Sequence, residues 1–237
     1  MLVVSNGVIK SGSSWLMLIA QRLIDVDELP EGFQDPAWSN SALKRDLLKD
    51  FLTEGHAYRN NYLVKNHFAV PGERNAMLFY PWCKVIMTFR DVRDSVVSRY
   101  FHHMRAEEVP SEGTFHEFFW APEPPNGRQT LEYLAQYAST WNVEDESLWK
   151  VRYEDLHADV GSAVRSLATF LDVDTATVDL DEIIRVSQPR AVTDSAGTGH
   201  IRTGRPGDWH NHLGERELEL IDEMVPQDIR QLVLRDD

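Results

Sequence analysis

The sequence predicts an α/β fold in which a mostly parallel central sheet carries helices on both faces. Continuous apolar runs predict buried strands at 2–9, 62–64, 84–89 and 148–151. Between these runs, apolar residues recur at helical spacing, and strands that alternate with helices are typical of a parallel sheet. Because 237 residues suit one large domain, we expect 1–237 to fold as a single domain.

Four stretches carry an apolar stripe that repeats every three or four residues, as one face of an amphipathic helix does. These stripes begin at Trp15, Val92, Leu131 and Val160. Segments rich in glycine, proline or acidic residues predict loops at 28–40, 107–114 and 194–209. The last of these loops contains four glycines and a proline, which favours a flap over a site.

Charge and composition exclude several classes of protein. A net charge of −14 opposes nucleic-acid binding, so a phosphate ligand would need a local site of lysines, arginines and backbone amides. No apolar run approaches the ~20 residues of a membrane span, and the N-terminus lacks the pattern of a secretory signal. The single cysteine, Cys83, cannot form an internal disulfide. We therefore expect a cytoplasmic protein with no membrane span and no nucleic-acid partner.

A glycine-rich loop follows the first predicted strand and leads into a helix at 7–15 (GVIKSGSSW). Its backbone amides and the helix N-terminus suit an anion, and Ser13 and Ser14 add hydroxyl donors. The glycine spacing is that of a Walker A motif, but Ser13 stands where that motif requires lysine, and Lys10 lies inside the loop. The alternative is an ordinary strand-to-helix turn with capping serines.

A second cluster follows the third predicted strand. Arg90 ends this strand, and Ser98 lies in the next helix. An arginine fork with a neutral hydroxyl donor is a good phosphate site. The alternative is a solvated helix start, in which Arg90 pairs with Asp91 or Asp94.

These two clusters, with three further segments, resemble the motifs of the cytosolic-type sulfotransferases that use 3′-phosphoadenosine 5′-phosphosulfate (PAPS). IKSGSSW and FRDVRDSVVSRY are similar to the family's 5′-phosphosulfate and 3′-phosphate motifs. The other similar segments are YLVKNH at 62–67, Trp141 followed by VRYEDL at 151–156, and IRTGRPGDW at 201–209. The resemblance covers nearly the whole chain, in the family's order, and implies the P-loop NTPase-like sulfotransferase fold.

The resemblance implies in-line transfer of the sulfuryl group of PAPS to a hydroxyl or similar acceptor, leaving adenosine 3′,5′-bisphosphate (PAP). It implies that Lys10 contacts the bridging oxygen, Lys65 the sulfuryl oxygens, and that His67 is the general base. A histidine pKa of about 6.5 suits a base near neutral pH. Two lysines aimed at developing negative charge suit electrostatic stabilisation of the transition state.

The resemblance also implies a set of nucleotide-binding residues. They are Lys10, Ser11, Gly12, Ser13, Ser14, Trp15, Arg90, Ser98, Tyr153, Arg202, Thr203 and Gly204. The loop would hold the 5′-phosphate, and Arg90, Ser98 and Arg202 would hold the 3′-phosphate. Trp15 would stack on adenine and Tyr153 would approach its edge, although both rings could instead be packing residues. We expect no metal, because no pattern among the histidines requires one.

Some positions depart from the family pattern. Ile9 replaces a proline before the loop lysine, and Thr203 replaces a lysine beside Arg202. The segment 210–219 lacks the family's short dimer-contact pattern, which leaves the oligomeric state open. We expect a small hydroxylated acceptor, whose identity the sequence does not predict.

Two other functions compete with this interpretation. A P-loop NTPase or nucleotide kinase has a similar architecture but needs a lysine in place of Ser13. A catalytically silent binding module would not need Lys10, Lys65 and His67 together, because binding alone requires no base.

Overall fold

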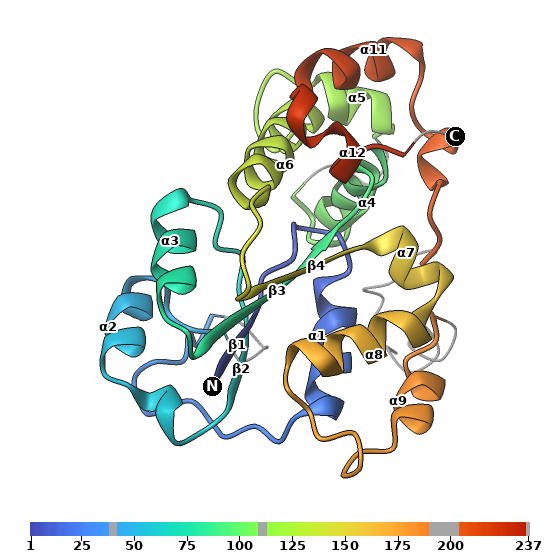
Figure 1. The fold of residues 1–237 in the computed structure, drawn as a ribbon. Coiled ribbons are helices and arrows are strands. Elements are labelled where there is room, and N and C mark those ends of the chain that lie inside the picture. Colours follow the sequence, from blue (N-terminus) through green and yellow to red (C-terminus); the bar gives the residue numbers. More distant parts are fainter. Residues whose placement is uncertain (38–41, 109–112, 190–203, 236–237) are drawn as a thin grey trace.

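A four-stranded parallel sheet forms the centre of the computed structural model, which describes residues 1–37, 42–108, 113–189 and 204–235 (Figure 1). The strands are β1 (Leu2–Ser5), β2 (Tyr62–Lys65), β3 (Cys83–Phe89) and β4 (Leu148–Arg152). Their order across the sheet is β2-β1-β3-β4, and every neighbouring pair is parallel. The predicted parallel α/β fold is therefore confirmed.

The described helices include all four that the apolar stripes predict, which are α1, α4, α6 and α8. The full set is α1 (Ser13–Leu23), α2 (Leu48–Thr53), α3 (Pro71–Phe79), α4 (Val92–Arg105), α5 (Phe115–Trp120), α6 (Gly127–Trp141), α7 (Tyr153–Ala158), α8 (Val160–Phe170), α9 (Leu180–Val186), α11 (Glu215–Met224) and α12 (Arg230–Val233). Short 3-10 turns are η1 (Arg45–Leu47), η2 (His56–Tyr58), η3 (Asp208–Asn211) and η4 (Gln227–Ile229).

The first predicted strand was too long, because β1 ends at Ser5 and the chain then enters a loop. The amides of Asn6 and Val8 still donate to β3, at 2.9 Å to Ile86 O and 3.0 Å to Thr88 O. The loop therefore runs along β3 as a strand would, and its apolar residues continue the hydrophobic pattern past the end of β1.

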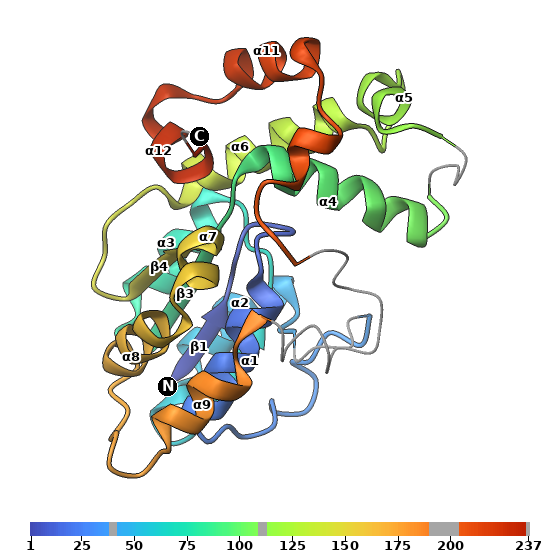
Figure 2. The same cartoon turned by 90° about the vertical axis from the view of Figure 1, so that its right-hand side faces the viewer.

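Successive side chains of β1 enter different hydrophobic cores, as the alternation of a strand requires. Leu2 and Val4 belong to a core shared with α3, α4 and α6, whereas Val3 belongs to a core shared with α1, α7 and α8. Figures 1 and 2 show α2 and α3 on one face of the sheet and α1 and α8 on the other. They also show α4, α5, α6, α11 and α12 gathered beyond the carboxyl ends of β3 and β4. Helices on both faces of the sheet are thus confirmed.

Helix α6 fixes the loops that follow β1 and β2. The buried Tyr137 hydroxyl donates to Asn6 O at 2.9 Å, and the buried Trp141 Nε1 donates to Phe68 O at 2.7 Å. Asn6 and Phe68 also bond to each other, through Asn6 Nδ2 to Phe68 O (3.1 Å) and Phe68 N to Asn6 Oδ1 (2.7 Å). The two loops are therefore held as one unit by buried polar groups.

Candidate functional site

The loop between β1 and α1, residues 6–12, packs closely on the neighbouring strands. A Cβ added to Gly7 would lie 2.1 Å from Thr88 Oγ1, so only glycine fits there. Gly12 has φ 96°, and a Cβ there would lie 2.7 Å from Tyr153 Cδ2. Lys10 has φ 66°, in the left-handed region that a side chain rarely adopts. Such residues persist where the surroundings fix the backbone, and they cluster at functional sites.

The three loop serines lie in different surroundings. The buried Ser11 hydroxyl lies 2.7 Å from Thr88 Oγ1 and within hydrogen-bond distance of Val8 O and Thr88 O, so it supports the loop from beneath. Ser13 is buried at the start of α1, where its carbonyl accepts from the Ser5 hydroxyl at 3.1 Å. Ser14 is exposed at the same helix start. The structure therefore leaves the Ser14 side chain the most accessible of the three.

Lys65 ends β2, and His67 follows two residues later. His67 Nδ1 lies 2.9 Å from Gly7 O. Because a carbonyl only accepts hydrogen bonds, Nδ1 carries the proton, and Nε2 of the neutral ring is left as an acceptor. Loss of hydration and the charge of Lys65 lower the pKa of His67 to about 4. The ring is therefore neutral at pH 7 and able to take a proton.

The pKa values of Lys10, in the loop after β1, and of Lys65, at the end of β2, are also shifted. Burial, followed by the charges of Arg105 and Arg99, lowers the pKa of Lys10 to about 8. Burial lowers the pKa of Lys65. These cations destabilise one another in the free protein, although the chain as a whole carries −14. A cluster of this kind suits a ligand with several negative charges, because such a ligand removes the repulsion.

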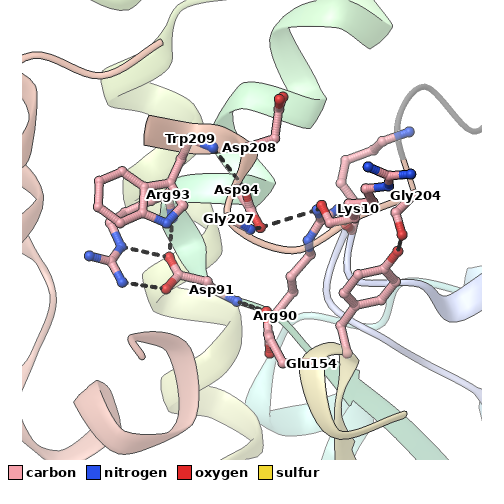
Figure 3. Close-up of polar contacts among 12 residues, drawn as sticks. Lys10, Arg90, Asp91, Arg93, Asp94, Glu154, Gly204, Gly207, Asp208 and Trp209 are labelled. Carbon is pink, nitrogen blue, oxygen red and sulfur yellow. Dashed lines mark hydrogen bonds and ion pairs between the residues drawn. The ribbon is translucent and has the colours of Figure 1, made fainter. Parts of the chain in front are cut away.

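Arg90 follows β3 and contacts four other residues of the chain (Figure 3). Its guanidinium lies over the Tyr153 ring at 4.4 Å and pairs with Asp94 Oδ2 at 3.2 Å. It also donates to Lys10 O at 3.4 Å and to Arg205 O at 3.3 Å. The alternative pairing with Asp94 is thus present, yet the buried Arg90 Nε has no hydrogen-bond partner among the described residues.

The segment 204–209 is tied to the same helix. The buried Asp94 carboxylate accepts from Gly207 N at 2.8 Å and from Trp209 N at 3.0 Å, as Figure 3 shows. The Tyr153 hydroxyl donates to Gly204 O at 2.8 Å. Gly204 therefore lies beside Tyr153, near Arg90. The predicted binding residues Arg202 and Thr203, with most of the predicted flap, lie outside the described residues.

The predicted adenine-binding rings are well packed. Trp15 is 7% exposed, its Nε1 donates to Ser187 O at 2.8 Å, and its ring meets that of Tyr153 edge to face at 5.8 Å. Both rings belong to the core that α1 shares with α7 and α8. Ser98 is half-buried on α4. The contacts of Trp15 and Tyr153 agree with the packing alternative, and their role toward adenine stays a prediction.

Several residues that hold this site together are missing from the predicted set. Asn6 and Thr88 position the first loop, and Asp94 positions Arg90 and the segment 204–209. Asp91 N donates to Glu154 Oε1 at 3.0 Å, which joins the starts of α4 and α7. The sequence does contain a signal for Asp94. This residue lies four residues after Arg90, and residues four apart with opposite charges often form an ion pair.

Two features are absent from the described part of the chain. There, no group of three or more histidine, cysteine or acidic side chains could hold a metal ion. None of the helices in the same ranges has the length and hydrophobicity needed to cross a membrane.

Fold and site together define a class: a parallel α/β protein with a cationic loop at the carboxyl ends of its strands. A family model described as "Sulfotransferase domain" matches residues 3–233, and the chain therefore belongs to this family. The family that the five motifs resemble is thereby confirmed.

Curated relatives carry sulfotransferase names. Sulfotransferase 2A6 of Rattus norvegicus is 26% identical over 237 residues, which cover 92% of this chain and 81% of the relative. Sulfotransferase 6B1 of Danio rerio is 26% identical over 164 residues, covering 65% of this chain and 54% of the relative. The chain thus spans about half the length of the 6B1 relatives that it matches.

Solved structures share the fold. A crystal structure of mouse sulfotransferase SULT7A1 complexed with PAP has a TM-score of 0.64 at 17% identity, covering 97% of this chain and 84% of that chain. Retinol dehydratase in complex with androsterone and inactive cofactor PAP has a TM-score of 0.62 at 16% identity, covering 99% of this chain and 82% of that chain. The sulfotransferase fold is therefore that of this chain.

Replacement of Asp94 by asparagine should lower the free energy of unfolding by about 3 kcal/mol, because it leaves Arg90 without its buried counter-charge. It also sets an amide NH₂ group against the N–H donors of Gly207 and Trp209. Urea denaturation measures this loss. The control is Asp222→Asn, whose exposed pair with Arg230 should contribute less than about 1 kcal/mol. Equal losses in the two variants would contradict the proposed importance of Asp94.

Proposed function

We propose that this protein transfers the sulfuryl group of PAPS to the hydroxyl of a small acceptor and releases PAP. The observation that carries the proposal is the meeting of Lys10, Lys65 and a neutral His67 at the carboxyl ends of β1 and β2. His67 has its Nδ1 proton fixed by Gly7 O, and its free Nε2 is suited to take a proton.

The residues fit a nucleotide with phosphates at both its 3′ and 5′ positions. Arg90 is 10% exposed and retains a buried Nε–H without a partner among the described residues, so it suits the 3′-phosphate. Lys10 and the amides of the loop that ends at Gly12 suit the 5′ end. Two structures that share this fold contain PAP, which supports the same nucleotide here.

When bound, PAPS supplies the sulfuryl group and a phosphate leaving group. His67 Nε2 takes the proton of the acceptor hydroxyl while the hydroxyl oxygen forms its bond to sulfur. Lys10 stabilises the charge left on the 5′-phosphate oxygen as the sulfur–oxygen bond breaks, and Lys65 stabilises the sulfuryl oxygens. The negative nucleotide also raises the pKa of His67, because it offsets the charge of Lys65. Nucleotide binding therefore makes His67 a stronger base.

Affinity for PAP should exceed affinity for adenosine 5′-monophosphate by more than about tenfold, because the 3′-phosphate gains charge-assisted hydrogen bonds from Arg90. Calorimetry measures both affinities. Arg90→Met should remove most of the difference, whereas Arg185→Met should keep it, because Arg185 pairs with Glu182 on the surface of α9. Equal affinities in the unmodified protein would overturn the proposal.

His67→Ala should lower turnover by about a hundredfold or more with a phenol acceptor, and should change PAP affinity only a few-fold. The reason is that His67 contacts the acceptor and not the nucleotide. His56→Ala is the control, because His56 pairs with Glu54 before β2 begins. Turnover that survives His67→Ala would show that another group is the base. His102, whose pKa burial and the charge of Lys10 lower to about 4, would then be tested.

Binding of PAP at pH 8 should draw protons onto the protein. Lys10 has a pKa of about 8 in the free protein, and adjacent phosphate raises it, so the bound state holds more protons. Affinity for PAP should therefore fall as the pH rises above 8. Calorimetry in two buffers of different ionisation enthalpy measures the uptake. Lys10→Met should reduce it and Lys49→Met, on the exposed side of α2, should not; unchanged uptake in Lys10→Met would refute the assignment.

A further inference from the structure

A cavity of about 470 Å³ opens beside the loop that contains Lys10. It lies between α4 and α6, within the size range of small-molecule sites. Its lining residues include Ile9, Arg99, His103, Glu108, Tyr133 and Leu134. Because Ile9 directly precedes Lys10, the cavity begins where the proposed sulfuryl transfer would take place. We therefore call it the acceptor pocket, an assignment that rests on the proposed function.

Arg99 is the cation of the acceptor pocket. Its guanidinium takes part in no hydrogen bond or ion pair with any residue that the structure describes. Burial lowers the pKa of Arg99, yet a guanidinium stays charged near neutral pH. The charge of Arg99 lowers the pKa values of both Lys10 and His67. Arg99 therefore lies close to the reacting end of the pocket and is half-buried without a counter-charge bound to it.

The nucleotide does not account for Arg99. Adjacent residues on a helix do not share a face, so Arg99 points in a different direction from its neighbour Ser98, which is predicted to bind the 3′-phosphate. Arg90 and Lys10 already suit the two phosphate ends of the nucleotide. Arg99 instead lines the acceptor pocket together with the phenol of Tyr133 from α6. A second negatively charged ligand, bound beside the nucleotide, would give the Arg99 guanidinium a counter-charge.

Glu108 only partly offsets Arg99. Its carboxylate lines the same pocket and raises the pKa of Arg99, but it is held by His103 Nδ1 and is 51% exposed. Lys10 and Lys65 add positive charge on the loop side. The pocket end nearest Lys10 is therefore cationic, although the whole chain carries −14. Charges further away than roughly 8 Å are largely screened in physiological salt, so this local excess outweighs the distant charge.

We propose that Arg99 binds a carboxylate of the acceptor, so that the acceptors are small hydroxylated carboxylates. The guanidinium forks onto the carboxylate, which gives a counter-charge to a half-buried cation that has no ion-pair partner among the residues described. Ile9, Tyr133 and Leu134 contact the carbon skeleton. The hydroxyl lies at the end of the pocket formed by Ile9, beside Lys10. A neutral phenol fills the same space but leaves Arg99 unpaired, which lowers its affinity.

The test compares 4-hydroxyphenylacetate with 4-hydroxyphenylacetamide, which have nearly the same shape and differ in charge. With PAPS, kcat/KM should be more than about tenfold higher for the carboxylate. Arg99→Met should abolish this preference, and Arg99→Lys should keep part of it because it keeps the charge. Both variants should bind PAP as the unmodified protein does. Arg128→Met is the matched control, because Arg128 precedes Gln129 on α6 but does not line the acceptor pocket.

Equal kcat/KM for the two acceptors, or a preference that survives Arg99→Met, would overturn the role of Arg99. If the amide is turned over while the carboxylate has no advantage, the proposed function stands and this inference alone fails. If neither compound is turned over, calorimetry on PAP-saturated protein decides. Tighter carboxylate binding that depends on Arg99 supports the inference, whereas equal or undetectable binding rejects it. Failure of PAP itself to bind would reject the proposed function and this inference with it.

Discussion

The buried amide of Asn6 is the contact on which the site depends. It bonds both main-chain groups of Phe68, and so joins the loop of Lys10 to the loop of His67. Tyr137 and Trp141 add hydrogen bonds to the same two residues from α6. A buried polar network is stable only when its members are all paired, so it allows one arrangement of the two loops. This buried network thereby sets how the loop of Lys10 and the loop of His67 lie relative to each other.

The buried positive charges of Lys10 and Lys65 lower the stability of the folded protein. The pKa of Lys10 is lowered from 10.5 to about 8, so the unfolded chain binds more protons than the folded chain between these values. Stability therefore rises with pH across that interval, because deprotonation of Lys10 removes the cost of burying its charge and its repulsion by nearby cations. Below about pH 8 both costs are fully present. The folded protein thus holds a cluster that an anionic ligand relieves, and that ligand stabilises the folded state.

The sequence was sufficient for the sheet and the long helices, because each strand is a continuous apolar run and each stripe spans several turns. It failed at the end of β1, since Val8 and Ile9 continue the apolar pattern although the chain has left the strand. It could not assign directions to the loop serines, because an inward-facing Ser11 and an outward-facing Ser14 are the same residue type. Nor could it find Asn6, whose partner Phe68 is 62 residues away. Local pattern predicts which elements form, whereas the end of β1 and the contacts between loops depend on packing.

Helix α4 carries two separate sets of charged and polar side chains. Asp94 and Ser98 are four residues apart and share a face, and Arg90 extends the same row from the end of β3. This row carries the ion pair of Arg90 with Asp94 and the contacts to Gly207 and Trp209. Arg99 lies one residue beyond Ser98 and lines the acceptor pocket instead. The two faces of the helix thus divide its charges. Under the proposed function, a change at Arg99 would alter the choice of acceptor and leave the row of Arg90, Asp94 and Ser98 intact.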